Sequence, residues 1–362
     1  MNLRLLLGPP GIAAGIGAAL LFGVGTPLAK SLLQGLDPWL LAGLLYLGSG
    51  VGLTLYRMAR GQFPWHLPAL HGAQWLWLLA AVAVGGGVAP VLLMFGLAAM
   101  PAASVSLLLN AEMVFTAWLA WHLFGENLER RAVLGILTIL AGAVILSLPE
   151  DLASTLSGAV RWPALWVLGA CLAWGLDNNF TRKVALADAA WLTSIKGLAA
   201  GSVNLAIALS LGATWPDGAL IGTAMGTGFF AYGVSLALFV VALRHLGAAR
   251  AGAFFSLAPF AGALVSVLWL GEALSWPLAL AGALMAWGAW LCLSEQHEHE
   301  HAHESLEHSH EHVHGAGEDG HHGHVHEDLP ADVAARHAHW HRHPALTHSH
   351  RHYPDGHHQH RH

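Results

Sequence analysis

Glu112 is a carboxylate near the middle of an apolar stretch, residues 101–126, that is long enough to cross a lipid bilayer. A membrane-spanning helix needs about 20 mostly apolar residues, and a charge at its centre costs roughly 2.5–3.5 kcal/mol on insertion scales. Two interpretations stay open. Glu112 has a structural role, hydrogen-bonded or kept neutral, or it lies beside an aqueous path, where it exchanges a proton or binds a cationic group. Asn110 belongs to the same candidate path.

Asp177 and Lys196 are expected to form an ion pair inside the membrane. Asp177 lies 7 residues before the end of a predicted span at 184, and Lys196 lies 7 residues after the start of the next span at 189. With a rise of 1.5 Å per residue, both lie about 10 Å from the same face of the membrane. The alternative for Lys196 is extension of its long side chain to the membrane surface. Three asparagines line the path or join helices through hydrogen bonds: Asn178, Asn179 and Asn204.

Two predicted spans are interrupted at corresponding positions of the chain. Gly87 and Pro90 break the third span, and Gly233 loosens the eighth. Interrupted helices at matching positions of two halves are typical of substrate sites in secondary transporters. The alternative is close helix packing through small residues. Pro259, which follows the residue that corresponds to Glu112, completes the candidate path residues.

The C-terminal segment, residues 295–362, has a different composition from the rest of the chain. It holds 23 of the 27 histidines, with 12 acidic and 4 basic residues. Low hydrophobicity and many acids predict a disordered tail. Neutral imidazoles bind Zn, Cu, Ni and Co, and a flexible chain can gather several of them. The alternatives are a solubilising low-complexity segment or a pH sensor. The predicted metal ligands are His297, His299, His301, His303, His308, His310, His312, His314, His321, His322, His324 and His326.

Composition places the rest of the chain in a membrane. The chain is 55% hydrophobic and only 10% charged, whereas soluble chains carry about 25% charged residues. Basic residues concentrate on the side of the N-terminus, so we expect a multi-pass protein of the cytoplasmic membrane with both termini in the cytoplasm. Ten spans are expected, at residues 11–33, 38–58, 74–98, 102–124, 131–149, 162–184, 189–211, 218–243, 248–270 and 276–294.

The spans fall into two sets of five that resemble each other. Residues 102–103 and 125–126 match residues 248–249 and 271–272 at a shift of 146. An odd number of spans in each copy turns the second copy upside down relative to the first, as in transporters with inverted repeats. The expected domains are residues 11–149, residues 162–294 and the tail at 295–362.

This ordered set resembles the EamA family of the drug/metabolite transporter superfamily over residues 11–294. The motifs that carry the resemblance are residues 20–23 with Lys30, 102–103 through 125–126, 174–175 with Arg182, 248–249 through 258–259, and 271–272. The resemblance implies an all-α integral membrane fold of ten transmembrane helices in two inverted repeats. It also implies a central cavity and alternating access for small metabolites, often as an exporter. The family usually carries proline at the position of Met113, so Glu112 lies where this chain departs from the pattern.

We therefore expect a secondary transporter, not an enzyme, that exports small metabolites with protons coupled through Glu112. The sequence contains no nucleotide-binding glycine loop. A transition-metal exporter or metal-responsive transporter that uses the tail stays open, and so does a membrane-anchored metal buffer. No cofactor is required, although the tail can take a divalent transition metal. The expected partners are the lipid bilayer and a small-molecule or ion substrate; a homodimer is considered, and no nucleic acid is expected.

Overall fold

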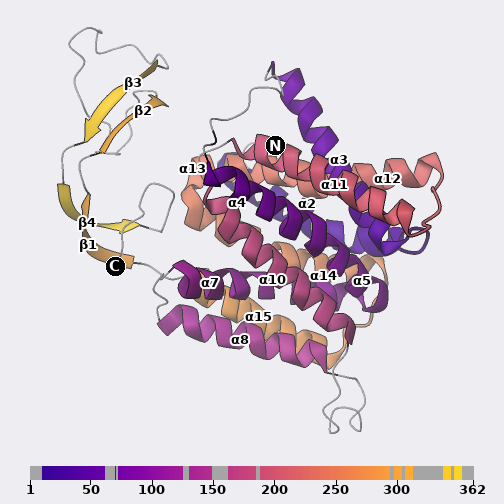
Figure 1. Ribbon diagram of the computed structural model, residues 1–362. Coiled ribbons are helices and arrows are strands. Elements are labelled where there is room, and N and C mark those ends of the chain that lie inside the picture. Colours follow the sequence, from indigo (N-terminus) through magenta and orange to yellow (C-terminus); the bar gives the residue numbers. More distant parts are fainter. Residues whose placement is uncertain are drawn as a thin grey trace, which may run out of the picture. The chain divides into compact units, whose positions relative to one another are not determined.

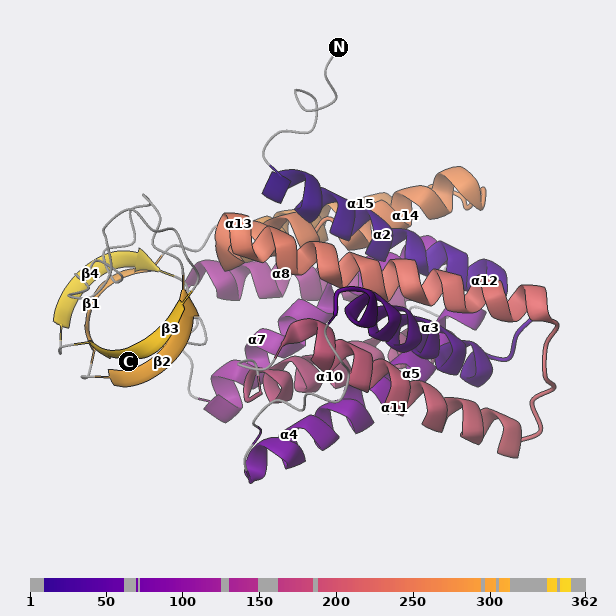
Figure 2. The ribbon, with the colours of Figure 1, turned by 90° about the horizontal axis from the view of Figure 1, so that it is seen from above.

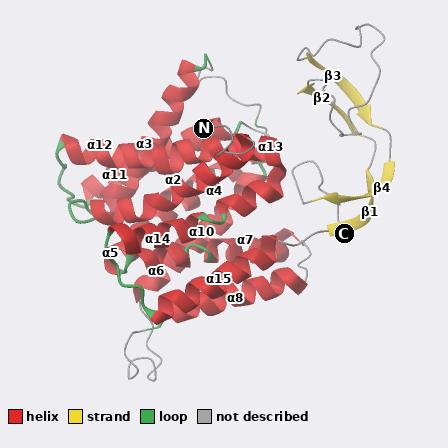
Figure 3. Ribbon diagram, turned by 180° about the vertical axis from the view of Figure 1, so that it is seen from behind, coloured by secondary structure: helices red, strands yellow, loops and turns green. Residues whose placement is uncertain are grey.

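The computed structural model describes residues 10–61, 70, 72–124, 130–148, 162–184 and 188–293, and four tail segments at 297–303, 306–312, 337–343 and 346–352. The chain divides into two compact units. One comprises residues 1–295 with 354–362, and the other comprises residues 296–353. Among the described residues, the first unit consists of helices and the second unit of strands (Figure 3).

The first half of the helical unit follows the predicted order of spans (Figure 1). Its helices are α2 (Pro10–Leu32), α3 (Pro38–Ala59), α4 (Ala73–Ala81), the π-helix η1 (Val82–Val88), α5 (Ala89–Ala99), α6 (Ala102–Leu108), α7 (Ala111–Phe124) and α8 (Arg130–Ser147). The second half contains α10 (Trp162–Arg182), α11 (Ala189–Ser210), α12 (Gly218–Gly228), the π-helix η2 (Phe229–Val234), α13 (Ser235–Phe255), α14 (Ala258–Trp269) and α15 (Trp276–Leu293). Each half contains one π-helix, at corresponding positions.

Eight helical runs in the described part of the chain are long and apolar enough to cross a membrane. The two remaining predicted spans correspond to α10, which carries Asp177 and two asparagines, and to the end of α13 with the 12-residue helix α14. The prediction of an all-helical, multi-pass membrane body is therefore confirmed.

Equivalent helices of the two halves pack against each other. α3 packs on α11, and α8 packs on α15; α2 packs on α13, just as α5 packs on α10 (Figure 2). Glycines allow these approaches. A Cβ atom on Gly43 would lie 2.8 Å from the backbone nitrogen of Leu205 in α11, and one on Gly135 would lie 2.6 Å from the carbonyl oxygen of Gly288 in α15. This reciprocal pairing is what an inverted duplication produces.

One predicted helix boundary is wrong. The sequence predicts a break between spans at residues 243–248, but α13 runs without interruption from Ser235 to Phe255. The equivalent junction in the first half is broken between α5 and α6 at Met100–Pro101. Pro101 disfavours helical geometry in the preceding residue, whereas its counterpart, Gly247, lets the helix continue. The second half breaks later, between α13 and α14, at the position that matches the α6–α7 junction.

The tail differs from the predicted disorder in its four described segments. β1 (His297–His303) pairs antiparallel with β4 (Leu346–His352), and β2 (Leu306–His312) pairs antiparallel with β3 (His337–His343). The alternating His-x-His pattern has the two-residue period of a β-strand. Antiparallel pairing gives hydrogen-bond partners to the backbone N–H and C=O groups, which a single strand leaves unpaired. The predicted ligands His314, His321, His322, His324 and His326 lie outside the described residues.

Candidate functional site

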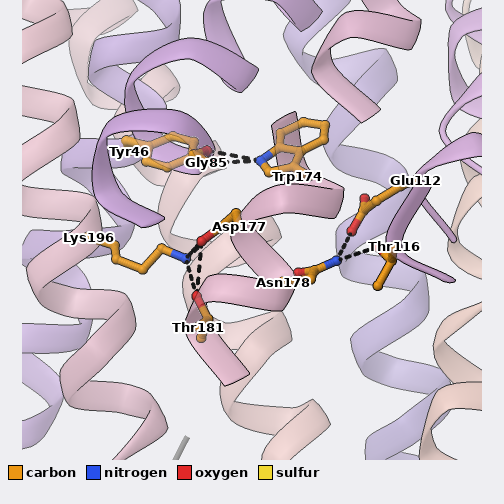
Figure 4. Close-up of polar contacts among 9 residues, drawn as sticks. All are labelled: Tyr46, Gly85, Glu112, Thr116, Trp174, Asp177, Asn178, Thr181 and Lys196. Atoms are coloured by element: carbon orange, nitrogen blue, oxygen red, sulfur yellow. Dashed lines mark hydrogen bonds and ion pairs between the residues drawn. The ribbon is translucent and has the colours of Figure 1, made fainter. Parts of the chain in front are cut away.

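The π-helix η1 is tied to other helices through its backbone carbonyl oxygens. A π-helical turn shifts the backbone hydrogen-bond pattern and is frequent at functional sites. The carbonyl oxygen of Gly85 accepts hydrogen bonds from the Tyr46 hydroxyl and from the Trp174 indole nitrogen, both at 3.0 Å (Figure 4). The carbonyl oxygen of Gly86 accepts one from the Asn204 amide at 3.0 Å. Helices α3, α10 and α11 thereby hold η1 in place.

Gly85 also permits the close approach of Asp177. A Cβ atom at position 85 would lie 2.1 Å from Asp177 Oδ2, so only glycine fits here. Gly87, which the sequence singled out, has nothing closer than 3.9 Å to its hypothetical Cβ. Pro90 is buried in α5, which follows η1 without a gap, so its missing amide hydrogen leaves a carbonyl oxygen of the preceding turn without its helical donor. Of Gly85 and Gly87, Gly85 is therefore the position where a side chain would clash.

Asp177 and Lys196 form the ion pair that their equal depth predicts. Lys196 Nζ donates to the two carboxylate oxygens of Asp177 at 2.6 and 2.7 Å. Thr181 donates a further hydrogen bond to Asp177 at 3.0 Å. The side chains are only 9% exposed for Asp177 and 17% for Lys196. The two charges are thus compensated inside the protein, and the pair ties α10 to α11.

Glu112 is bound differently. It lies in the first turn of α7, directly after the break at Leu109–Asn110. Its Oε1 atom accepts a hydrogen bond from the Asn178 amide at 2.9 Å, and that amide also donates to the Thr116 hydroxyl at 3.1 Å (Figure 4). This hydrogen bond is solvent-accessible. Among the described residues, no group donates to the second oxygen, Oε2, so the carboxylate keeps unused hydrogen-bonding capacity.

The other predicted path residues have local structural contacts. Asn110 is buried and donates to the carbonyl oxygen of Leu107 at 2.9 Å, which closes the end of α6. Asn179 donates to the carbonyl oxygens of Gly175 and Thr116 at 2.8 and 3.2 Å. Gly233 lies in η2 and Pro259 in the first turn of α14. None of these contacts brings Asn110, Asn179 or Pro259 to Glu112.

Sequence reasoning missed the aromatic residues of the site. Tyr46 and Trp174 hold η1, and Tyr232 lies inside η2 with its ring centroid 6.1 Å from that of Tyr46. The chain has only 4 tyrosines. A tyrosine within an apolar span needs a hydrogen-bond partner for its hydroxyl. That signal could have identified Tyr46 and Tyr232 as candidate site residues.

Lys30 of the first half and Glu272 of the second half both bind at the α5–α6 junction, and Glu272 thereby joins the two halves. Lys30 Nζ donates to the carbonyl oxygens of Leu97 and Met100 at 2.7 and 3.0 Å, at the end of α5. The Glu272 carboxylate accepts the first two backbone amides of α6 at 2.6 and 2.7 Å. Opposite charges therefore complement the two helix ends that Pro101 separates.

Comparisons with known proteins agree with this architecture. The model of the EamA-like transporter family matches residues 9–148 and 161–294. An uncharacterized transporter of Methanothermobacter thermautotrophicus is 28% identical over 291 residues, which cover 76% of this chain and 84% of that protein. A protein of known crystal structure has a similar fold, with a TM-score of 0.56 and 21% identity over 77% of this chain and 94% of that one.

Proposed function

Because this chain belongs to the EamA-like transporter family and is a multi-pass membrane transporter, we propose that it is a secondary transporter that exports a small metabolite in exchange for protons. In this proposal the protein lies in the cytoplasmic membrane with both termini in the cytoplasm, as its basic residues favour. Glu112 is the group that carries the proton.

The observation that carries the proposal is the bonding of the Glu112 carboxylate. One oxygen accepts a hydrogen bond from Asn178, and the other has no donor among the described residues. Within a membrane span, lipid cannot solvate such an oxygen, so it requires water, a proton or a substrate group. A carboxylate that alternates between these partners can bind a proton on one side of the membrane and release it on the other.

The Asp177–Lys196 pair supports the same assignment by contrast. Its opposite charges satisfy each other at 2.6 and 2.7 Å, and removal of a proton or addition of one would break that arrangement. We therefore assign the pair a structural role between α10 and α11, and we assign proton coupling to Glu112.

The proposal is tested in proteoliposomes that contain the full chain, with a pH gradient across the membrane. The probes are a panel of amino acids, simple amines and divalent metal ions, and a pH-sensitive dye reports proton movement. We expect at least one panel member to dissipate the gradient. Glu112→Gln keeps the hydrogen-bonding shape but cannot exchange a proton, so it should abolish this dissipation, whereas Glu112→Asp should retain part of it.

The matched control removes the other charged pair. The double variant Asp177→Asn/Lys196→Met carries no net charge change and should still couple solute flux to protons. The assignment to Glu112 is wrong if Glu112→Gln dissipates the gradient as fast as the native chain. If no panel member is moved by the native chain, the proposed export of small metabolites fails as well.

A second candidate function, export of transition metals or metal-responsive transport, is supported by the strand register of the tail. Six cross-strand positions pair one histidine with another: His297 with His352, His299 with His350, His301 with His348, His308 with His341, His310 with His339, and His312 with His337. In each pair the two histidines occupy directly opposite positions of the strand register. Zn, Cu, Ni and Co suit imidazole ligands.

This second function is tested in the full-length chain by replacing the histidines of these pairs with asparagine. Metal-dependent transport that needs the tail should be lost, whereas proton-coupled flux of organic solutes should persist. If the substituted chain transports metal as the native chain does, the tail has no part in transport. If the native chain binds metal but moves none, the tail is a metal buffer.

A further inference from the structure

Two polar atoms in partly buried residues of the spans have no hydrogen-bond partner among the described residues, in addition to buried atoms such as Ser49 Oγ and Ser106 Oγ. One is Oε2 of Glu112, and the other is the Tyr232 hydroxyl, which forms no hydrogen bond with any described residue although Tyr232 lies inside the π-helix η2. The neighbouring Tyr46 hydroxyl in α3 is satisfied by contrast, because it donates to the carbonyl oxygen of Gly85. Polar groups inside proteins are nearly always paired with protein, water or ligand. Glu112 and Tyr232 therefore have bonds to offer to a molecule in the transport path.

Tyr232 belongs to a row of aromatic rings that joins both halves of the molecule. Its ring centroid lies 6.1 Å from that of Tyr46 in α3 and 5.6 Å from that of Phe22 in α2. Phe22 in turn lies 5.2 Å from Phe255 in α13. All four residues are only partly buried. This row, Tyr46–Tyr232–Phe22–Phe255, is called the aromatic row below.

The aromatic row is connected to Glu112 through α10. The Trp174 indole nitrogen lies 3.4 Å from the Tyr46 hydroxyl, at the first ring of the row. Asn178, which holds Glu112, lies one helical turn further along α10, about 6 Å away along the axis. Figure 4 shows Trp174 and Tyr46 on one side of Asp177 and the Glu112–Asn178 contact nearby. Successive contacts through α10 and α3 thus connect the acid to the rings.

The charge of this site is negative. Lys196 is neutralised by Asp177, Arg57 forms an ion pair with Asp188, and Lys30 donates to carbonyl oxygens at the end of α5. Glu112 has no cationic partner among the described residues. An uncompensated carboxylate in a low-dielectric region attracts a cation, and aromatic faces attract cations and flat apolar groups as well.

We propose that the transported metabolite is a small organic cation with a flat aromatic part. Its ammonium group binds the Glu112 carboxylate, its ring packs on Tyr232 and Phe22, and the Tyr232 hydroxyl bonds to a polar atom of the solute. This inference rests on the proposed function, because it names the substrate class of the same transport site. Close packing of core aromatics would explain the row alone, but it leaves the open hydroxyl of Tyr232 and the open oxygen of Glu112 unexplained.

The test uses solutes that differ in one property at a time. Tryptamine is an aromatic cation, butylamine is a cation without a ring, and indole-3-acetate is an aromatic anion. In proteoliposomes of the full chain, tryptamine should be transported with the lowest KM, butylamine with a KM about tenfold higher, and indole-3-acetate not at all, because stacking and cation–π contacts require both parts.

Variants then separate the ring from the hydroxyl. Tyr232→Leu removes the ring and should raise the KM for tryptamine about tenfold, while the KM for butylamine stays unchanged. Tyr232→Phe keeps the ring and the fold, and should have a smaller effect on the same KM. Tyr56→Leu is the matched control, because this exposed tyrosine in α3 lies outside the aromatic row; it should leave both KM values unchanged.

The outcomes separate this inference from the proposed function. If the native chain moves other panel solutes but neither amine, or moves indole-3-acetate as well as tryptamine, the substrate class is wrong while proton-coupled export stands. If Tyr232→Leu, shown to be folded by its thermal transition, transports tryptamine with the native KM, the aromatic row takes no part in recognition. If no organic solute moves, both the inference and the proposed function fail.

Discussion

The π-helices η1 and η2 occupy corresponding positions in the two halves but are held in opposite ways. In η1, the carbonyl oxygens of Gly85 and Gly86 accept side-chain hydrogen bonds from α3, α10 and α11. In the described part of the chain, no side chain donates to a carbonyl oxygen of η2. The Tyr232 hydroxyl within η2 also has no such partner. The same backbone feature is therefore held by side-chain hydrogen bonds in one half, and by side-chain packing without such bonds among the described residues in the other.

Gly85 and Gly233 differ in the same direction, whereas Gly228, directly before η2, is packed as tightly as Gly85, since a Cβ atom there would lie 2.0 Å from the carbonyl oxygen of Leu45. A Cβ atom on Gly85 would meet Asp177 Oδ2 at 2.1 Å, whereas one on Gly233 in η2 would have its nearest contact, a ring carbon of Phe229, at 3.3 Å. The helix ends differ as well. Lys30 and Glu272 complement the ends of α5 and α6, while α13 passes through the equivalent junction unbroken.

This comparison indicates that the π-helices of the two halves have different roles. The first half supplies η1 and the α5–α6 junction, and the second half supplies the Asp177–Lys196 pair and two of the side chains that hold η1. The second half supplies the π-helix whose geometry can change, because its rearrangement breaks no side-chain hydrogen bond among the described residues. We expect η2 to be the segment that moves during transport, and the following predictions test that contrast.

The largest effect is expected from Asp177→Asn. Removing one partner of a buried ion pair leaves the Lys196 charge uncompensated and costs about 3–5 kcal/mol of stability. The thermal unfolding midpoint in lipid or detergent should fall markedly. The double variant with Lys196→Met should recover most of the loss, since it removes both charges. A double variant as unstable as the single one would contradict a simple charge-pair role.

Gly85→Ala should destabilise the fold by about 1–3 kcal/mol, because a methyl group must displace the Asp177 carboxylate. The matched variant is Gly233→Ala in η2, where the nearest atom belongs to the side chain of Phe229 and can shift. Its unfolding midpoint should change little. Equal losses at the two positions would show that η1 and η2 are held alike.

Tyr46→Phe should cost about 1 kcal/mol or less, because Trp174 continues to satisfy the carbonyl oxygen of Gly85. Tyr232→Phe should cost nothing in stability, since the hydroxyl it removes has no partner in the described structure. Unfolding midpoints of both variants, measured side by side, check this pair. A larger loss for Tyr232→Phe would mean that its hydroxyl stabilises the folded protein.

Much of the fold could be predicted from the sequence, because apolar length and glycine or proline breaks are local signals. The internal duplication and the equal depth of Asp177 and Lys196 were also sufficient to predict inverted repeats and an ion pair. The boundary at 243–248 was wrong, since the repeat suggested a break that only the first half enforces with Pro101.

The site was less predictable because it depends on contacts between distant segments. No local pattern indicates that Tyr46 and Trp174 both donate to the carbonyl oxygen of Gly85. Nor does any pattern indicate that Asn178 donates to Glu112, whereas Asn179 donates to a carbonyl oxygen of its own helix. Gly85 and Gly87 cannot be distinguished in the sequence, although only Gly85 faces Asp177. The sequence indicated which polar residues to consider. The packing of the helices determined which of them keep hydrogen-bonding groups free for a ligand.

The central claim is that the open carboxylate of Glu112 couples solute movement to protons. It is tested most directly by comparing two kinds of flux in Glu112→Gln proteoliposomes, with tryptamine and the rest of the amine panel as probes. Gradient-driven accumulation should disappear, and exchange of labelled for unlabelled amine without a gradient should weaken as well, because the ammonium group binds the same carboxylate as the proton. Accumulation at the native rate in Glu112→Gln would contradict the account.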